Sequence, residues 1–264
     1  MSLSSPEYAA LEVTAGQPLL AQVEHWAAIN SGSRNLPGLA TVAGHLADAF
    51  SVLPGDLALR DPAPVDAMGA DGVARPVDHG RNLHLVVRPQ APVQVLLTGH
   101  MDTVFGADHP FQSLAWREAG VLNGPGTADM KGGLAVILAA LRGLEVSPLA
   151  PRMGYEVVVN SDEEVGSPGS AALIAAAARG KVAALTYEPA LPDGTLAGAR
   201  PGSGNFSIVV RGRAAHAGRN PEDGRNAVLA AAALALRLEA LRQPGLTVNP
   251  AKIEGGAPNN MVPD

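Results

Sequence analysis

A short apolar segment that favours β-structure and ends in a polar loop recurs three times along this chain of 264 residues. The segments are VQVLLTG (93–99), YEVVVNS (155–161) and VAALTYEPA (182–190). Apolar segments follow the first two loops, GLAVILAALRGL (133–144) and AALIAAAARG (171–180), and both are long enough to be helices. Strands that alternate with helices predict an α/β fold, here a central mixed, mostly parallel sheet flanked by helices.

The remaining segments extend this prediction at both ends. Apolar residues at helical spacing predict helices over 18–31 and after Pro37, and NLHLVVRP (82–89) predicts a strand beside 93–99. Ser167 and Pro168 predict the start of the helix over 171–180. Beyond about Gly198 the pattern changes to a strand over 206–215, a long helix over 220–242 capped by Asn220, and a strand over 246–256. We therefore expect two domains, 1–197 and a smaller α+β domain over 198–264.

Composition excludes several classes of function. Hydrophobic residues make up 47% of the chain, which is typical of a globular protein, and the longest apolar run (227–236) is far shorter than the ~20 residues of a membrane span. A net charge of −6 without a Lys/Arg cluster argues against nucleic-acid binding. The N-terminal residues lack a secretory pattern, so we expect a cytoplasmic protein. With no cysteine in the chain, any metal has to be held by nitrogen and oxygen.

Polar side chains collect in the loops at the predicted strand ends. They comprise one imidazole and five carboxylates: His100, Asp102, Asp129, Glu163, Glu164 and Glu188. In open α/β sheets, ligands bind at the carboxyl ends of the strands. Carboxylates packed together repel one another unless a cation compensates them, and zinc accepts both imidazole nitrogen and carboxylate oxygen. The sequence therefore predicts a metal site, with room for a pair of ions that share a carboxylate.

Each residue also has a simpler interpretation. His100 fits a hydrogen-bonded histidine at a strand end, Asp129 a helix cap, and Glu163–Glu164 a solvated turn. Glu188, next to Pro189, fits an exposed strand end. A single metal site explains all of these residues at successive strand ends more simply than four separate interpretations do. The loop GPGTADMKGG (124–133) lacks the ending of a phosphate-binding loop, and no serine-nucleophile motif occurs.

Five motifs in order give the chain a family resemblance. They are GHMDTV, GPGTADMKGG, NSDEEVGSPG, the Glu-Pro after a strand, and GRAAHAGRNPEDGRNA. Together they resemble the dinuclear zinc enzymes that include aminoacylase, acetylornithine deacetylase, succinyl-diaminopimelate desuccinylase and the carboxypeptidase G type of glutamate carboxypeptidase. The resemblance spans residues 80 to 264 and implies a zinc-exopeptidase-like fold with a lid and dimerisation domain.

The resemblance also implies a role for each residue. His100 and Glu188 would ligate one zinc, Asp129 would bridge two, and Glu164 would ligate the other. Asp102 would orient His100, and Glu163 would be the general base. His216, supplied by a partner subunit, would stabilise the oxyanion, and Asn260 would grip the substrate. A glutamate at 188 favours the carboxypeptidase G and aminoacylase side of the family. The expected cofactor is two Zn²⁺, with Co²⁺ or Mn²⁺ as substitutes.

The predicted function is metal-dependent hydrolysis of an amide or peptide bond next to a free carboxylate. Candidate substrates are an N-acyl amino acid, a glutamate conjugate and a short peptide, and the predicted partner is a second copy of the chain, bound through the lid. The family usually continues beyond such a segment and supplies a last histidine to the second zinc, so we expect a truncated version of a longer enzyme. The alternative is a non-catalytic domain that keeps at most one zinc and dimerises through its lid.

Overall fold

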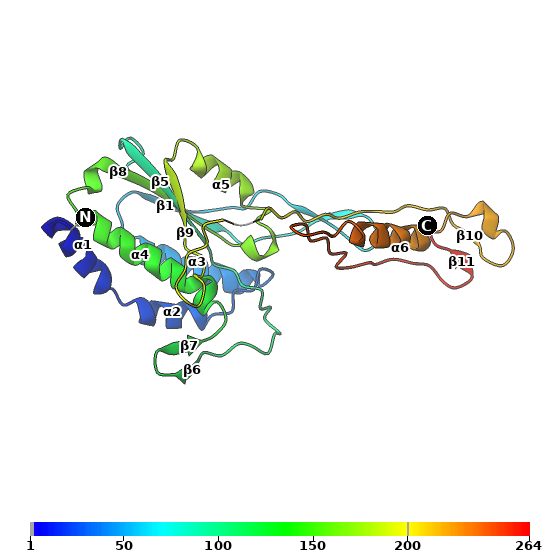
Figure 1. Ribbon diagram of the computed structural model, residues 1–264, viewed down its shortest axis with the longest axis horizontal. Coiled ribbons are helices and arrows are strands. Elements are labelled where there is room, and N and C mark those ends of the chain that lie inside the picture. The colour runs from blue at the N-terminus through cyan, green and yellow to red at the C-terminus, as the bar shows by residue number, and fades with distance from the viewer. Residues whose placement is uncertain (1–2, 200) are drawn as a thin grey trace. The chain divides into compact units, whose positions relative to one another are not determined.

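The computed structural model describes residues 3–199 and 201–264, which form two compact units (Figure 1). The first comprises Met1–Val65 and Asp78–Pro201, and the second comprises Asp66–Val77 and Gly202–Asp264. In the C-terminal half of the chain, the boundary between the units lies between Pro201 and Gly202. The sequence pattern did not indicate that the short segment Asp66–Val77 joins the second unit.

A five-stranded mixed sheet forms the centre of the first unit. The strands are β1 (Asp56–Arg60), β4 (Asn82–Val87), β8 (Met153–Asn160), β5 (Val93–His100) and β9 (Ala183–Thr186), in that spatial order. β5 runs parallel to β8 and β9, whereas β4 runs antiparallel to β1 and β8. The predicted mixed α/β sheet is confirmed, although parallel pairs are half of the total rather than most of it.

The order of the central strands corrects one expectation. β4 and β5 are close in sequence, and we expected them to be neighbours, but β8 lies between them. β8 is buried along almost its whole length, with Tyr155, Val157, Val158 and Val159 all fully enclosed. A strand that is apolar on both faces gains most from a central position, and this outweighs the short connection between β4 and β5.

Helices cover both faces of the sheet. Helices α2 (Leu19–Ala27), α3 (Leu36–Phe50) and α4 (Gly132–Glu145) pack on one face through residues such as Trp26, Leu46 and Leu138. The other face carries α5 (Ala171–Ala178), whose Ala177 packs on Leu96 and Val158. The two helices expected near the N-terminus are α2 and α3.

Helix α1 (Ser5–Ala15) was not predicted, although its start carries a recognisable signal. Ser4 and Glu7 form a capping box, in which the Glu7 carboxylate accepts a hydrogen bond from the backbone N–H of Ser4 at 2.6 Å. The predicted start of α5 is wrong. Its cap is Ser170, because Ser167 has a positive φ of 56° and lies in the preceding loop.

Two hairpins complete the strands of the N-terminal half of the chain. β6 (Ala115–Glu118) pairs with β7 (Val121–Asn123) in the first unit, and β2 (Asp66–Met68) pairs with β3 (Ala74–Pro76) in the second. The second unit also contains β10 (Ala215–His216), α6 (Ala227–Glu239) and β11 (Met261–Val262). β10 and β11 pair antiparallel.

The second unit departs from the sequence expectations in three places. Residues 206–214 and 246–256 are not strands, because an extended segment becomes a strand only where a neighbouring strand pairs with it. Within the predicted strand 206–215, the described residues show only two pairings. These are the isolated bridge between Arg213 and Arg225, and the start of β10. Helix α6 begins at Ala227, and its cap is Asn226, which accepts a hydrogen bond from Leu229 N at 2.9 Å, rather than Asn220.

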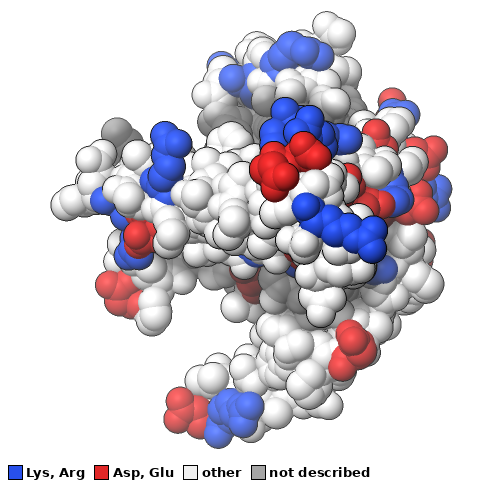
Figure 2. Space-filling view, turned by 90° about the vertical axis from the view of Figure 1, so that its right-hand side faces the viewer, with Lys and Arg blue, Asp and Glu red and all other residues white. Residues whose placement is uncertain are grey.

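The surface carries charges of both signs. On the face shown in Figure 2, acidic and basic side chains are scattered among uncharged residues. Among the residues that the structure describes, no helix combines the length and apolar character needed to cross a bilayer.

Gly133, in the first turn of α4, permits a close approach that a side chain would block. A Cβ at this position would overlap the carbonyl oxygen of Tyr187, which follows β9. We predict that Gly133→Ala lowers the free energy of unfolding by about 1–3 kcal/mol, measured by urea denaturation. The control is Gly44→Ala in α3, where a Cβ meets no atom, and where alanine is expected to add about 0.5–1 kcal/mol. Equal effects of the two substitutions would contradict this packing.

Candidate metal centre

The parallel strands bring the predicted site residues to one edge of the sheet. β5 ends at His100, which pairs with Asn160 at the end of β8, and Glu188 follows two residues after the end of β9. Glu163 and Glu164 lie in the turn after β8, and Asp129 lies in the segment Thr127–Lys131 that leads into α4. Loops from four parts of the chain therefore meet at this edge.

His100 is the centre of the cluster. Its side chain is 1% exposed, and its backbone N–H donates to Met130 Sδ at 3.1 Å. The ring atom Nδ1 lies 3.0 Å from the backbone oxygen of Asp102 and 3.3 Å from Asp102 Oδ1. Because both neighbours are acceptors, Nδ1 carries a proton, and when the ring is neutral the lone pair of Nε2 is available to a cation between the ring and the other carboxylates.

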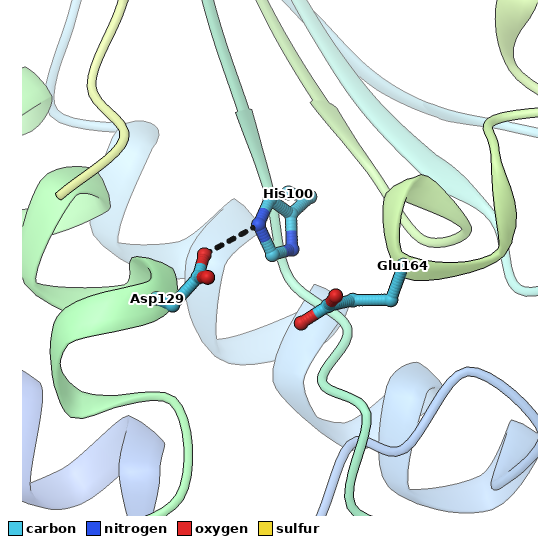
Figure 3. A group of neighbouring side chains, drawn as sticks. All are labelled: His100, Asp129 and Glu164. Carbon is cyan, nitrogen blue, oxygen red and sulfur yellow. Dashed lines mark hydrogen bonds and ion pairs between the residues drawn. The ribbon is translucent and has the colours of Figure 1, made fainter. Parts of the chain in front are cut away.

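Three carboxylates approach Nε2 of His100. Asp129 Oδ1 lies at 3.0 Å, Glu188 Oε1 at 3.7 Å and Glu163 Oε2 at 4.0 Å. His100, Asp129 and Glu164 each place a ligand atom within 4.8 Å of the others (Figure 3). The structure thus gathers all six residues that the sequence analysis placed at the strand ends, with Asp102 behind the ring of His100.

The charges in this cluster shift its pKa values. Burial lowers the pKa of His100, but the hydrogen bond to Asp102 and the nearby carboxylates outweigh burial and raise it to about 9. Burial, with repulsion from Asp129 and Glu163, raises the pKa of Glu188 to about 7 against the attraction of His100. Burial also raises the pKa of Glu164. Burial and repulsion between carboxylates both favour the protonated acid, and a compensating cation would oppose both effects.

The donor set fits a borderline metal ion. It consists of imidazole nitrogen and carboxylate oxygens, which Zn²⁺, Co²⁺ and Mn²⁺ all accept. The His100 side of the cluster is buried. The Asp129 side, whose side chain is 55% exposed, is open to solvent. A metal ion bound there would favour the deprotonated form of these acids.

Asp102 has a second role that the sequence did not indicate. Its carboxylate is fully buried, and it accepts hydrogen bonds from Ser33 Oγ at 2.7 Å and from the backbone N–H groups of Glu163 and Glu164 at 3.2 Å. Asp102 thus connects β5 to the loop that carries both glutamates. Ser33 escaped the sequence analysis because a loop serine 69 residues away carries no periodic or motif signal.

Two other residues missed by the sequence analysis shape the loops. Asp162, fully buried, accepts hydrogen bonds from Gly169 N and Ser170 Oγ, each at 2.6 Å, and this draws the Glu163–Glu164 loop into a compact turn. Lys131 is also buried, and its ammonium group donates to the backbone oxygen of Ile29 at 3.1 Å. Burial lowers the pKa of Lys131 to about 8.

The remaining two candidates lie in the second unit. His216 in β10 pairs with Met261 in β11, and the backbone N–H of Ala217 donates to the Asn260 carbonyl at 2.9 Å. Residues 44 positions apart in sequence are therefore brought together. His216 is exposed, and its Nδ1 accepts a hydrogen bond from Gly218 N at 3.1 Å, which leaves Nε2 as the ring atom that points away from its own turn.

Comparison with known proteins identifies the family. The model described as "Peptidase family M20/M25/M40" matches residues 96–258, more than half of the chain. The chain belongs to this peptidase family. The resemblance that the motifs carry is thereby confirmed.

Two curated relatives and one solved structure illustrate the similarity. Carboxypeptidase G2 from Pseudomonas sp. is 34% identical over 191 residues, which are 70% of this chain and 45% of that protein. Acetylornithine deacetylase from Proteus mirabilis is 33% identical over 144 residues, 51% of this chain and 34% of that protein. The chain thus spans less than half the length of these two relatives. A tripeptidase from Staphylococcus aureus shares the fold, with a TM-score of 0.57 and 22% identity over 93% of this chain and 63% of that chain.

Proposed function

We propose that this chain carries the metal centre of a hydrolase that cleaves an amide or peptide bond next to a free carboxylate, in the cytoplasm. The observation that carries the proposal is the approach of three carboxylates from separate loops to Nε2 of one buried histidine. The names of two relatives, a carboxypeptidase and a deacetylase, support amide hydrolysis near a carboxylate. Candidate substrates are an N-acyl amino acid, a glutamate conjugate and a short peptide.

The proposed ligands divide between two zinc ions. His100 and Glu188 would hold one, Glu164 the other, and Asp129 would contact both; Co²⁺ or Mn²⁺ fits the same donors. Bound zinc supplies Lewis acidity, which makes a coordinated water easier to deprotonate and a carbonyl easier to attack. Asp102 keeps the proton of His100 on Nδ1, so that Nε2 remains available as a ligand.

Glu163 is the proposed general base. Its side chain is about half exposed, so its carboxylate reaches solvent and a substrate, while its backbone is fixed by the hydrogen bond to Asp102. In this position Glu163 would accept a proton from the attacking water and later pass it to the leaving amine. The partner subunit's His216 is the proposed donor to the oxyanion, and Asn260 is the proposed contact to the substrate.

Replacement of Glu163 tests the assignment of the base. Glu163→Gln removes the proton acceptor but keeps the size of the side chain, so turnover should fall by roughly 10²–10⁴ while zinc content stays unchanged. The measurement is hydrolysis of the three candidate substrate classes, with zinc determined by elemental analysis of the same samples. Glu12→Gln, at an exposed position of α1, is the control and should match the unmodified protein. Retained turnover in Glu163→Gln would rule out this role.

A second candidate function is supported by the surface of the second unit. Phe206, Leu229 and Leu236 are 87%, 67% and 74% exposed. Leu229 and Leu236 are seven residues apart, so two helical turns place them on the same side of α6. Large apolar side chains exposed together commonly mark a protein interface. We propose that a second copy of this chain covers this side of α6. The alternative function is then that of a non-catalytic domain, which dimerises through this surface and binds at most one zinc ion.

Light scattering after size-exclusion chromatography tests the dimer. We expect twice the chain mass for the unmodified protein and the single-chain mass for the double variant Leu229→Asp/Leu236→Asp, because two carboxylates would be buried at the interface. Leu11→Asp, at an exposed leucine of α1, should leave the dimer intact. A monomer in every sample would contradict the proposed interface.

A further inference from the structure

The segment that carries Ser33 is fixed against the chain that follows β5. Gly32 forms a parallel bridge with Thr103, Ser33 N donates to the Thr103 carbonyl at 3.2 Å, and Thr103 N donates to the Ser31 carbonyl at 3.0 Å. A Cβ at Gly32 would press against the carbonyl oxygen of Phe105, so glycine permits this approach. The serines on either side of Gly32 are therefore held in defined positions beside residues 101–103.

The two serines point to different acceptors. Ser31 Oγ donates to the backbone oxygen of Met101 at 2.7 Å, and Ser33 Oγ donates to Asp102 Oδ2 at the same distance. Ser31 is 0% and Ser33 6% exposed, so both hydroxyls are shielded from water. Only the hydroxyl of Ser33 contacts a carboxylate.

Three hydrogen bonds reach the Asp102 carboxylate, and the ring of His100 lies beside it. Oδ1 accepts from the backbone N–H of Glu163 and lies 3.3 Å from Nδ1 of His100. Oδ2 accepts from the backbone N–H of Glu164 and from Ser33 Oγ. A carboxylate offers about four lone pairs, so three hydrogen bonds from separate donors, with the His100 ring beside Oδ1, fix its rotation. Without the Ser33 hydroxyl, one lone pair of Oδ2 is buried and unpaired, and the rotation of the carboxylate is less constrained.

We propose that Ser33 is a positioning residue of the metal centre: its hydroxyl fixes Asp102, and through Asp102 it aligns both His100 and the Glu163–Glu164 loop. This inference rests on the proposed metal site. Groups behind the ligands of a metal commonly change metal affinity by about 10–100-fold when they are removed, because they set the orientation of the ligands. The effect of Ser33 should be of this size, since it acts on ligands from two loops at once.

Ser31 provides a matched control for the experiment. Ser33→Ala and Ser31→Ala each remove one buried hydrogen bond of the same length, but only the first involves Asp102. We measure zinc affinity of the whole chain by competition with a chromophoric chelator, and the absorption spectrum of the Co²⁺ form, which reports the geometry of the ligands. Both variants should lower the midpoint of urea unfolding similarly. Ser33→Ala should bind zinc about 10–100-fold more weakly and alter the Co²⁺ spectrum.

The controls should retain the metal centre. Ser31→Ala should keep the zinc affinity and the Co²⁺ spectrum of the unmodified protein, and Ser33→Thr, which keeps the hydroxyl, should resemble it as well. If Ser33→Ala does not fold, Ser33→Cys replaces it with the same expectations, because a thiol is a weak hydrogen-bond donor.

Three results would overturn the inference. Zinc affinity and Co²⁺ spectrum unchanged in the Ser33 variant would reject the positioning role alone, while the metal site would stand. Equal losses of affinity in the Ser31 and Ser33 variants would show general loosening rather than an effect through Asp102. If the unmodified protein binds no zinc, the proposed function and this inference are both rejected. This result differs from the first one, so failure of the inference alone can be told from failure of the proposed function.

Discussion

The site depends on the parallel, in-register pairing of β5 with β8, which runs from Val93 opposite Met153 to His100 opposite Asn160. Parallel strands end at the same edge of a sheet, and side chains just beyond their ends are therefore neighbours. A one-residue slip would turn His100 to the other face of the sheet and away from the acids. The alternation along β8 favours this register, because Tyr155, Val157 and Val159 lie in one core cluster, whereas Glu156 lies on the opposite face and bonds His84 and Lys181.

Charge imposes the second constraint. The strand ends deliver more carboxylates than one imidazole can neutralise, and burial together with this repulsion raises the pKa values of Glu164 and Glu188. Backbone hydrogen bonds to Asp102 and Asp162 hold the glutamate loop in place despite this repulsion. The fold thus holds together carboxylates that repel one another when no cation is bound and that are stabilised when a cation lies among them. This is a common property of metal sites.

The sequence predicts the parts of this account that depend on local patterns. The end of β5 at His100, the position of Glu188 just after β9, and the acids between them follow from apolar segments that stop at polar loops. The order of strands does not, because the central position of β8 is decided by competition for burial among all the strands. Ser33 could not be found either, since its contact with Asp102 joins residues 69 positions apart without a motif. In the second unit, alternation alone predicted strands over 206–214 and 246–256, where no partner strand among the described residues pairs with them.

The number of zinc ions bound per folded chain, measured by elemental analysis after dialysis, tests the central claim most directly. His100→Ala provides the comparison, because it removes the one nitrogen ligand and should abolish or strongly reduce the bound zinc. We predict two zinc ions per chain for the unmodified protein, which would mean that the described carboxylates hold the second ion without a further ligand, whereas one zinc ion would favour the non-catalytic alternative. A folded protein that retains no zinc, or that retains the same amount in His100→Ala, would contradict the account.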